Sequence, residues 1–297
     1  MTTKLLLPLL NRTVTMFKGP TWYLSERVSI EAISTEDHGI VFRYAPPEYQ
    51  SLLSPKSKCI RIEAVDERKC DDIAKIEGTI ISFLLNYFKS SHPISLSFAI
   101  QIKKNPRSQV LKKIIDLPFV VDTRSQRTHN YRIRDNVPRG NISDFYKVIS
   151  KVNEKYPGIL LTLDRFSAAL FRTGDYDKII DITISLESLI RGTTELQHKF
   201  SLYNSWAAEA DNNNRRKCQE LLRALYNARS AIVHGTAMSQ KEYDKKIKPV
   251  LDKWNDVIKI AEKALGYHLL YIYDNDIDKW HEHQESLSLG IAERITW

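Results

Sequence analysis

The spacing of apolar residues changes once along this 297-residue chain, and that change constrains the fold more than any other feature. In the first half, apolar side chains recur at every second position, as in Ile94–Ile102, which is typical of strands. In the second half they recur at every third or fourth position, which is typical of amphipathic helices. The sequence therefore predicts an α+β chain, with an N-terminal mixed α/β domain over residues 1–155 and an all-α helical bundle over residues 156–297. The boundary lies at Lys155–Gly158, where a Pro and a Gly interrupt both patterns.

Strands and one helix are predicted for the N-terminal domain. Apolar residues three and four positions apart predict a helix over Ile73–Tyr87. Alternating apolar residues predict strands over 28–32, 40–44, 60–64 and 94–102. The run STEDHG (Ser34–Gly39) is interpreted as a hairpin loop between the first two of these strands. The run LLLPLL (Leu5–Leu10) is too short for a signal sequence and is interpreted as an opening strand or packing segment.

Helices alone are predicted for the C-terminal domain. Their five apolar stripes cover residues 159–170, 179–189, 200–210, 218–232 and 247–265. The connections between the stripes are short and polar, which favours an antiparallel bundle. His281 and His283 follow the last stripe, but no Cys or carboxylate cluster at ligand spacing accompanies them. We therefore expect no metal there and interpret the segment as a solvated tail.

Positive charge is concentrated in the N-terminal domain. Residues 1–155 hold 25 Lys and Arg against 16 Asp and Glu, whereas residues 156–297 hold 19 against 20. The steepest part is Lys103–Arg139, with ten basic and three acidic residues. Such a surface attracts polyanions, among which nucleic acid is the commonest in the cytoplasm. The residues predicted to bind RNA, by their interleaving with aromatic side chains, are Arg124, Arg127, Arg132 and Arg134. An exposed basic loop with incidental aromatic residues is an equal alternative.

Cysteine content and hydropathy predict the compartment. The chain has three cysteines, Cys59, Cys70 and Cys218, and their odd number and wide spacing indicate neither a disulfide framework nor a CxxC pair. No apolar run approaches the about 20 residues that a membrane helix needs. We therefore expect a soluble, reduced protein of the cytoplasm that has no membrane partner, no metal and no cofactor.

Two polar residues at the end of the fourth predicted helix carry the functional hypothesis. Helical spacing from Cys218 places Arg229 on the apolar face, where a guanidinium is rarely found without a partner. His234 follows directly before Gly235, a residue suited to the position beyond a helix end. A phosphate-binding arginine and a histidine that titrates near neutral pH are what metal-free RNA cleavage requires. The spacing alone is unspecific, and five residues separate two side chains by about 140° around a helix axis.

Three segments extend the pattern beyond that pair. They are LESLIRG (Leu186–Gly192), ELQHKFSLYNSWAA (Glu195–Ala208) and YNARSAIVHG (Tyr226–Gly235). Together they resemble the Apea-like branch of the HEPN superfamily, over about residues 158–273, and the last segment, with its Arg-x4-His motif, is the most specific. The matching residues are Leu186, Glu187, Leu189, Glu195, Lys199, Tyr226, Arg229, Ser230, Ile232, Val233, His234 and Gly235. Where the family commonly has a basic residue in its third helix, this chain has Tyr203–Asn204.

The resemblance implies a fold and a reaction. Domains of this family are helical bundles, and many are metal-independent endoribonucleases. His234 would assist attack by a ribose 2′-OH on the adjacent phosphodiester, or would protonate the 5′-oxygen that leaves. Arg229 would stabilise the charge of the phosphorane, and Ser230 would orient one of them or contact phosphate. Glu187 would orient Arg229, with Tyr226 in a supporting role, although a plain ion pair is an equal reading of Glu187. The products would be 2′,3′-cyclic phosphate and 5′-OH ends, formed without a metal or cofactor.

The resemblance also implies partners. In family enzymes two bundles pair so that both motifs face one composite cleft, so we expect RNA as substrate and a homodimer through the bundle. Many members are toxins or phage-defence effectors, which makes the N-terminal domain a sensor or substrate guide and allows a protein or phage-derived activator. The alternative is a catalytically silent HEPN module that binds RNA, a nucleotide or a protein through the same cleft.

Overall fold

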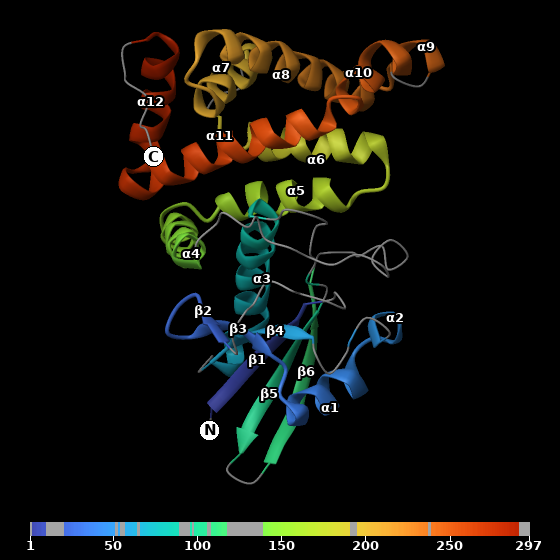
Figure 1. Ribbon diagram of the computed structural model, residues 1–297, viewed down its shortest axis with the longest axis vertical. Helices are drawn as coiled ribbons and strands as arrows, with labels where there is room; N and C mark the ends of the chain where they lie inside the picture. The colour runs from blue at the N-terminus through green and yellow to red at the C-terminus, as the bar shows by residue number, and fades with distance from the viewer. Residues whose placement is uncertain are drawn as a thin grey trace. The chain divides into compact units, whose positions relative to one another are not determined.

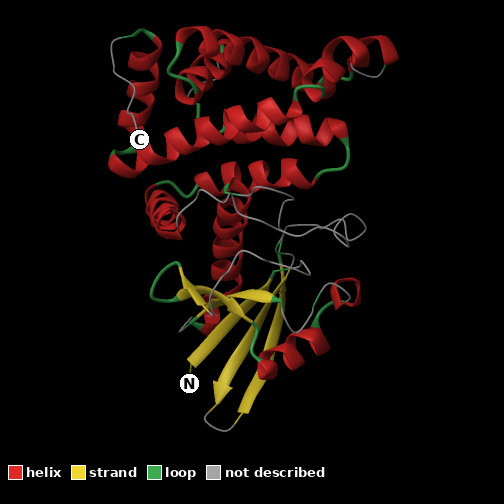
Figure 2. Cartoon of the chain, in the orientation of Figure 1, coloured by secondary structure: helices red, strands yellow, loops and turns green. Residues whose placement is uncertain are grey.

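The computed structural model divides the chain into two compact units, Met1–Lys147 and Val148–Trp297. The division falls inside helix α4 (Arg139–Lys155), whereas the boundary predicted from the sequence lies at the end of that helix. The residues that the structure describes are 2–9, 21–50, 53, 57–63, 66–88, 96, 98–105, 108–117, 139–190, 195–236 and 239–290. Within these ranges the strands all belong to the first unit, and the second unit is helical (Figures 1 and 2). The predicted α+β class and the helical C-terminal region are confirmed.

The first unit is built on one antiparallel sheet of six strands in the order β2-β3-β4-β1-β5-β6. The strands are β1 (Thr2–Pro8), β2 (Thr21–Tyr23), β3 (Val28–Ala32), β4 (Lys58–Ile62), β5 (Phe98–Asn105) and β6 (Ser108–Asp116). The predicted opening strand and the strands expected near residues 28 and 60 are confirmed, whereas β2 and β6 were not predicted. The strand expected from residue 94 corresponds to β5, which begins at Phe98. The first strand of the chain thus lies at the centre of the sheet, between β4 and β5.

Both faces of β1 are covered, which explains its unbroken apolar run. Leu5, Leu6 and Leu7 are all fully buried, although successive strand residues point to opposite faces. Helix α3 (Cys70–Tyr87), predicted over 73–87, packs on one face: a Cβ on its Gly78 would lie in ordinary contact with Leu7 Cδ2, at 3.6 Å, and more tightly against Leu117 Cδ1, at 3.3 Å, so a larger residue there would have to displace Leu117 slightly. Leu6 points to the other face and belongs to a buried cluster with residues of helix α1 (Thr35–Tyr44).

The residues predicted as a hairpin loop and a second strand form helix α1, so both predictions are wrong. Ser34 caps the helix, because its Oγ accepts the backbone N–H of Asp37 at 3.1 Å. Acidic residues in the first turn add a favourable interaction with the helix dipole. The alternation of Ile40, Phe42 and Tyr44 is coincidental, since the residue that enters the core from this turn is Val41. Helix α2 (Pro47–Gln50) follows.

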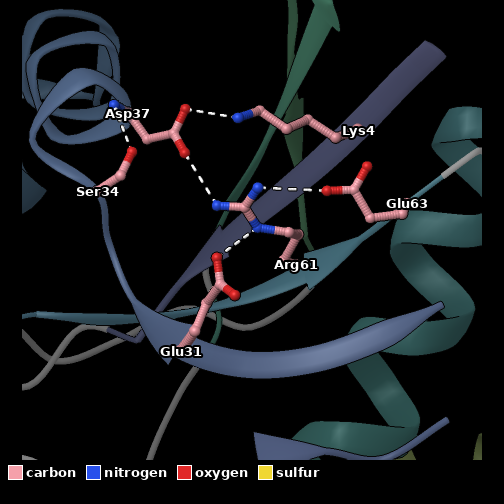
Figure 3. Close-up of polar contacts among 6 residues, drawn as sticks. All are labelled: Lys4, Glu31, Ser34, Asp37, Arg61 and Glu63. Atoms are coloured by element: carbon pink, nitrogen blue, oxygen red, sulfur yellow. Dashed lines mark hydrogen bonds and ion pairs between the residues drawn. The ribbon is translucent and has the colours of Figure 1, made fainter. Parts of the chain in front are cut away.

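Ion pairs connect α1 to the sheet (Figure 3). Lys4 of β1 and Asp37 of α1 are both almost fully buried, and Lys4 Nζ lies 2.7 Å from Asp37 Oδ1. Arg61 of β4 binds the other oxygen of Asp37 through Nη2 at 3.1 Å, and also pairs with Glu31 and Glu63. Removing one partner of such a buried pair leaves an uncompensated charge and costs about 3–5 kcal/mol. Through Asp37, these pairs therefore hold α1 against strands β1 and β4 of the sheet.

The second unit contains the helices that the first four C-terminal stripes predict. The helices after α4 are α5 (Ile159–Phe171), α6 (Asp175–Glu187), α7 (Leu196–Ala208), α8 (Asn212–Val233), α9 (Gln240–Glu242), a π-helical turn η4 (Tyr243–Ile247), α10 (Lys248–Leu251), α11 (Trp254–Asp274) and α12 (Ile277–Ser288). The fifth stripe does not form one long helix, which corrects that prediction. Pro249 lies in the first turn of the short α10, and Lys253 leaves helical geometry before α11 begins.

The segment predicted as a solvated tail forms α12, so that prediction is wrong for its inner face. Trp280 is buried, and its indole Nε1 donates to the backbone oxygen of Leu189 at 3.3 Å. His283 lies 2.8 Å from the hydroxyl of Tyr267 and stacks on Tyr271 with ring centroids 4.0 Å apart. His283 is buried and is therefore a core residue, and this burial lowers its pKa. No helix within the described ranges has the length and apolar character needed to cross a membrane.

Candidate functional site

Helix α8 places the residues of the predicted motif. Asp211 caps its start by accepting the backbone N–H of Asn214 at 2.9 Å. At the other end the backbone N–H of His234 still bonds to the Ser230 carbonyl at 3.0 Å, and Gly235 then adopts a positive φ of 68°. Glycine tolerates this left-handed conformation, as predicted for this position. The helix therefore stops at His234 and leaves its side chain exposed.

A groove of about 600 Å³ borders the C-terminal half of α8, and we call it the α8 groove. It is lined by Ala224, Asn227, Ser230, Ala231, His234 and Thr236 on one side and by Lys245, Lys246 and Pro249 of η4 and α10 on the other. It brings together an exposed imidazole, the hydroxyls of Ser230 and Thr236 and two ammonium groups. Groups of these kinds move protons near neutral pH and hold the oxygens of a phosphate.

The two lysines of the α8 groove differ in their partners. Lys246 Nζ lies 2.7 Å from Glu242 Oε2, and this hydrogen bond lowers the pKa of the Glu242 carboxyl. Lys245 is exposed and forms no ion pair within 4 Å with any residue that the structure describes. Lys245 is therefore the ammonium group that an incoming anion meets without displacing another partner.

Arg229 lies beside Glu187, the last residue of α6, and both side chains are partly buried. Arg229 Nη2 is 3.8 Å from Glu187 Oε2, close enough for an ion pair but too long for a hydrogen bond. Arg229 Nε and Glu187 Oε2 are both buried, and neither has a hydrogen-bond partner among the described residues. The Glu187 carboxylate thus balances the charge of Arg229, while most N–H donors of the guanidinium have no hydrogen-bond partner among the described residues.

Tyr226 lies one turn before Arg229 on α8. The guanidinium carbon of Arg229 is 5.9 Å from the centre of the Tyr226 ring, at the outer limit of a cation–π contact. The ring also packs against Phe200 of α7, with centroids 5.3 Å apart. Burial, and then the nearby charge of Glu187, raise the pKa of Tyr226, so its phenol stays protonated at neutral pH.

The structure sorts the predicted site residues into two groups. Ser230 and His234 line the α8 groove, whereas Arg229, Glu187 and Tyr226 form a separate cluster and are absent from the lining, as far as the described residues go. This matches the separation of about 140° that five helical residues impose. Asn204, where the resemblance leads one to expect a basic residue nearby, is fully buried, and its Oδ1 lies 3.0 Å from His268 Nε2. The four arginines predicted to bind RNA, residues 124, 127, 132 and 134, lie outside the described residues.

The structure adds Lys245 and Lys246 to the residues that sequence reasoning found. Their signal is the basic run from Lys245 to Lys248, shortly after the motif. The nearly balanced charge of residues 156–297, taken as a whole, conceals this local excess. Comparison of the chain with protein-family models, with curated proteins and with solved structures finds no match.

Proposed function

We propose that residues 156–297 form an Apea-like HEPN bundle and that this protein is a metal-independent endoribonuclease. The observation that carries the proposal is the α8 groove, where Ser230 and His234 of the motif share one surface with Lys245 and Lys246. The ammonium groups attract the phosphates of RNA, and the imidazole supplies proton transfer at the phosphate that they hold.

The reaction conserves atoms and charge without an added reagent. The ribose 2′-oxygen attacks the adjacent phosphorus, a P–O2′ bond forms, and the bond from phosphorus to the 5′-oxygen breaks. His234 accepts the 2′-OH proton or donates a proton to the departing 5′-oxygen. Ser230 donates a hydrogen bond to a non-bridging oxygen. The products are a 2′,3′-cyclic phosphate and a 5′-OH end.

In this proposal Arg229 completes the site of a second copy of the chain. On its own chain it belongs to the cluster with Glu187 and is no part of the described groove lining. Its uncommitted donors suit the charge that develops on the phosphorane. A two-fold dimer through the bundle pairs Arg229 of one copy with His234 of the other.

The proposed setting is the cytoplasm, where the substrate RNA is abundant. The N-terminal unit then acts as a sensor or substrate guide, which its excess of basic residues supports. A toxin or phage-defence role, with a protein or phage-derived activator, is consistent with a nuclease that carries such an added unit.

The test is cleavage of total RNA by the purified chain in excess EDTA. We expect fragments with 2′,3′-cyclic phosphate and 5′-OH ends from the wild type and from His198→Ala, which removes an exposed histidine of α7. We expect no fragments from His234→Ala, whose exposed side chain contributes little to folding. RNA binding without cleavage by the wild type would instead favour a silent binding module, and full cleavage by His234→Ala would refute the assignment.

A further inference from the structure

The first unit contains a second pocket, of about 740 Å³, which we call the Glu77 pocket. Its wall includes the apolar side chains of Val28, Ile62 and Ile73, from β3, β4 and α3. Glu77 of α3 and Tyr146 of α4 supply polar groups to the same pocket. A pocket of this size, with apolar walls and a few polar groups, suits a small organic ligand.

Glu77 is a carboxyl group that lacks a cation. The hydroxyl of Tyr146 donates to Glu77 Oε2 at 2.9 Å, but no Lys, Arg or His forms an ion pair with Glu77 in the described part of the chain. Burial raises the pKa of Glu77 to about 7, and the hydrogen bond from Tyr146 offsets part of that rise. Glu77 is partly buried, and a partly buried carboxylate gains from a positive partner, which a bound cation supplies.

The rim of the Glu77 pocket favours a cation over an anion. The charged side chains that line it, besides Glu77, are Glu26, Arg27, Glu63, Asp66 and Lys69. Carboxyl groups therefore outnumber basic groups by four to two when Glu77 is counted. Glu63 already pairs with Arg61 at 3.2 Å, whereas Glu26 is exposed. An elongated cation with a second positive charge thus finds a carboxylate at Glu77 and further carboxylates among the exposed lining residues.

We propose that the Glu77 pocket binds an aliphatic diamine or polyamine, with one ammonium group on Glu77 and the methylene chain against Val28, Ile62 and Ile73. The second ammonium group lies at the rim, near Glu26 and Asp66. Methylene groups gain free energy by leaving water for this apolar wall. The N-terminal unit thus has a ligand of its own, whether or not the second unit cleaves RNA.

Calorimetric titration of the full chain with 1,4-diaminobutane at pH 8 tests the proposal. We expect saturable binding by the wild type and affinity at least about tenfold lower for Glu77→Gln, which loses a charge-assisted hydrogen bond. The rim variant Glu26→Gln is the matched control, with a smaller loss. Butane-1,4-diol has the same chain without the charges and is expected not to bind. Equal binding of the diol, or full affinity in Glu77→Gln, would overturn the proposal.

A pH series separates Glu77 from the rim carboxylates. Protonation of Glu77 removes the charge that holds the ammonium group, so wild-type affinity falls about tenfold between pH 8 and pH 6 for a carboxyl with a pKa of about 7. The pocket lining contains no histidine that titrates in the same range. Tyr146→Phe removes a hydrogen bond to the carboxylate, so the midpoint of this change moves to higher pH. A pH-independent affinity, or the same midpoint in Tyr146→Phe, contradicts the proposal even if Glu77→Gln does not fold.

Discussion

Arg229 and Glu187 lie 3.8 Å apart, from Nη2 to Oε2, and form an ion pair without a hydrogen bond. Glu187 ends α6 and Arg229 belongs to the last turns of α8, so the pair joins two helices of the second unit. Because the two groups do not saturate each other, the guanidinium lies beside the carboxylate and keeps donors that no described residue occupies, which the proposed reaction assigns to the phosphorane.

Glu187→Gln should therefore lower the rate of RNA cleavage while it changes the melting temperature little. The amide leaves Arg229 charged but without the carboxylate that holds it, and misplacement of a catalytic group lowers the single-turnover rate by about tenfold. Glu220→Gln, which breaks the exposed pair with Arg216, is the control. Thermal unfolding and single-turnover cleavage are measured on both variants. An unchanged cleavage rate in Glu187→Gln would show that the ion pair has only a structural role.

Arg229→Lys should lower cleavage by about a hundredfold, although it keeps the charge. Lysine lacks the planar fork that binds two phosphate oxygens at once. Arg216→Lys makes the same change at an exposed position of the same helix and should have no effect. Wild-type rates for Arg229→Lys would mean that the residue only attracts RNA by its charge.

Mixing two inactive variants tests the composite site. Arg229→Lys and His234→Ala, mixed and allowed to exchange subunits, form dimers in which one site holds an intact Arg229 and an intact His234. Random exchange should restore about a quarter of wild-type cleavage, because half of the dimers are mixed and each has one intact site. Light scattering establishes the oligomeric state of the mixture. An active monomer would argue against an active site built from two chains. So would the absence of restored cleavage in a mixture that contains mixed dimers.

The fold was predictable from the sequence where one local pattern dominates. Val28–Ala32 alternates and forms β3, and the stripe of α3 is helical along its whole length. α1 is hard to predict because the accidental alternation of Ile40, Phe42 and Tyr44 competes with the helix-start signals of Ser34 and the acidic first turn. β6 was missed because SQVLKKIID is too polar to stand out, and its pairing with β5 at the edge of the sheet is a tertiary effect.

The site was predictable only in part. The motif segment identifies Arg229, Ser230 and His234, and the structure places the partner suggested for Arg229, Glu187, beside it. The groove requires tertiary structure, because Lys245 and Lys246 lie on the π-helical η4, which lines the groove opposite α8. The spacing of apolar residues in the sequence does not predict a π-helical turn.

Lys245→Gln should weaken RNA binding in a way that depends on salt. Each phosphate contact to a single strand contributes about 0.7 to the slope of log affinity against log salt, so one lost contact flattens the slope by about that amount. Lys246→Gln should have a smaller effect, since Lys246 already pairs with Glu242. Replacing Arg124, Arg127, Arg132 and Arg134 together with Gln shows, by the change in the same salt slope, how many phosphate contacts these four arginines make. An unchanged slope in Lys245→Gln would place RNA outside the α8 groove.

The second unit should lose stability in acid through His268. This residue is fully buried beside Asn204, and burial lowers its pKa to about 3, below the ordinary value of about 6.5 in the unfolded chain. Below pH 6.5 the unfolded chain binds the proton more readily, so stability that is fully present above pH 6.5 falls as pH decreases toward 3. At pH 5 the loss is about 2 kcal/mol, measured by denaturant unfolding. His268→Gln should flatten this dependence, whereas His198→Ala should not.

The position of β1 in the sheet governs the order in which the first unit can form during synthesis. Its residues are made before those of its two neighbours, β4 and β5, and the latter ends at Asn105. The nascent chain must therefore keep one or both edges of this apolar strand unpaired until β4 and then β5 have been made, which exposes it to aggregation. Deleting Thr2–Pro8 would divide the sheet into β2-β3-β4 and β5-β6, with no strand to join them.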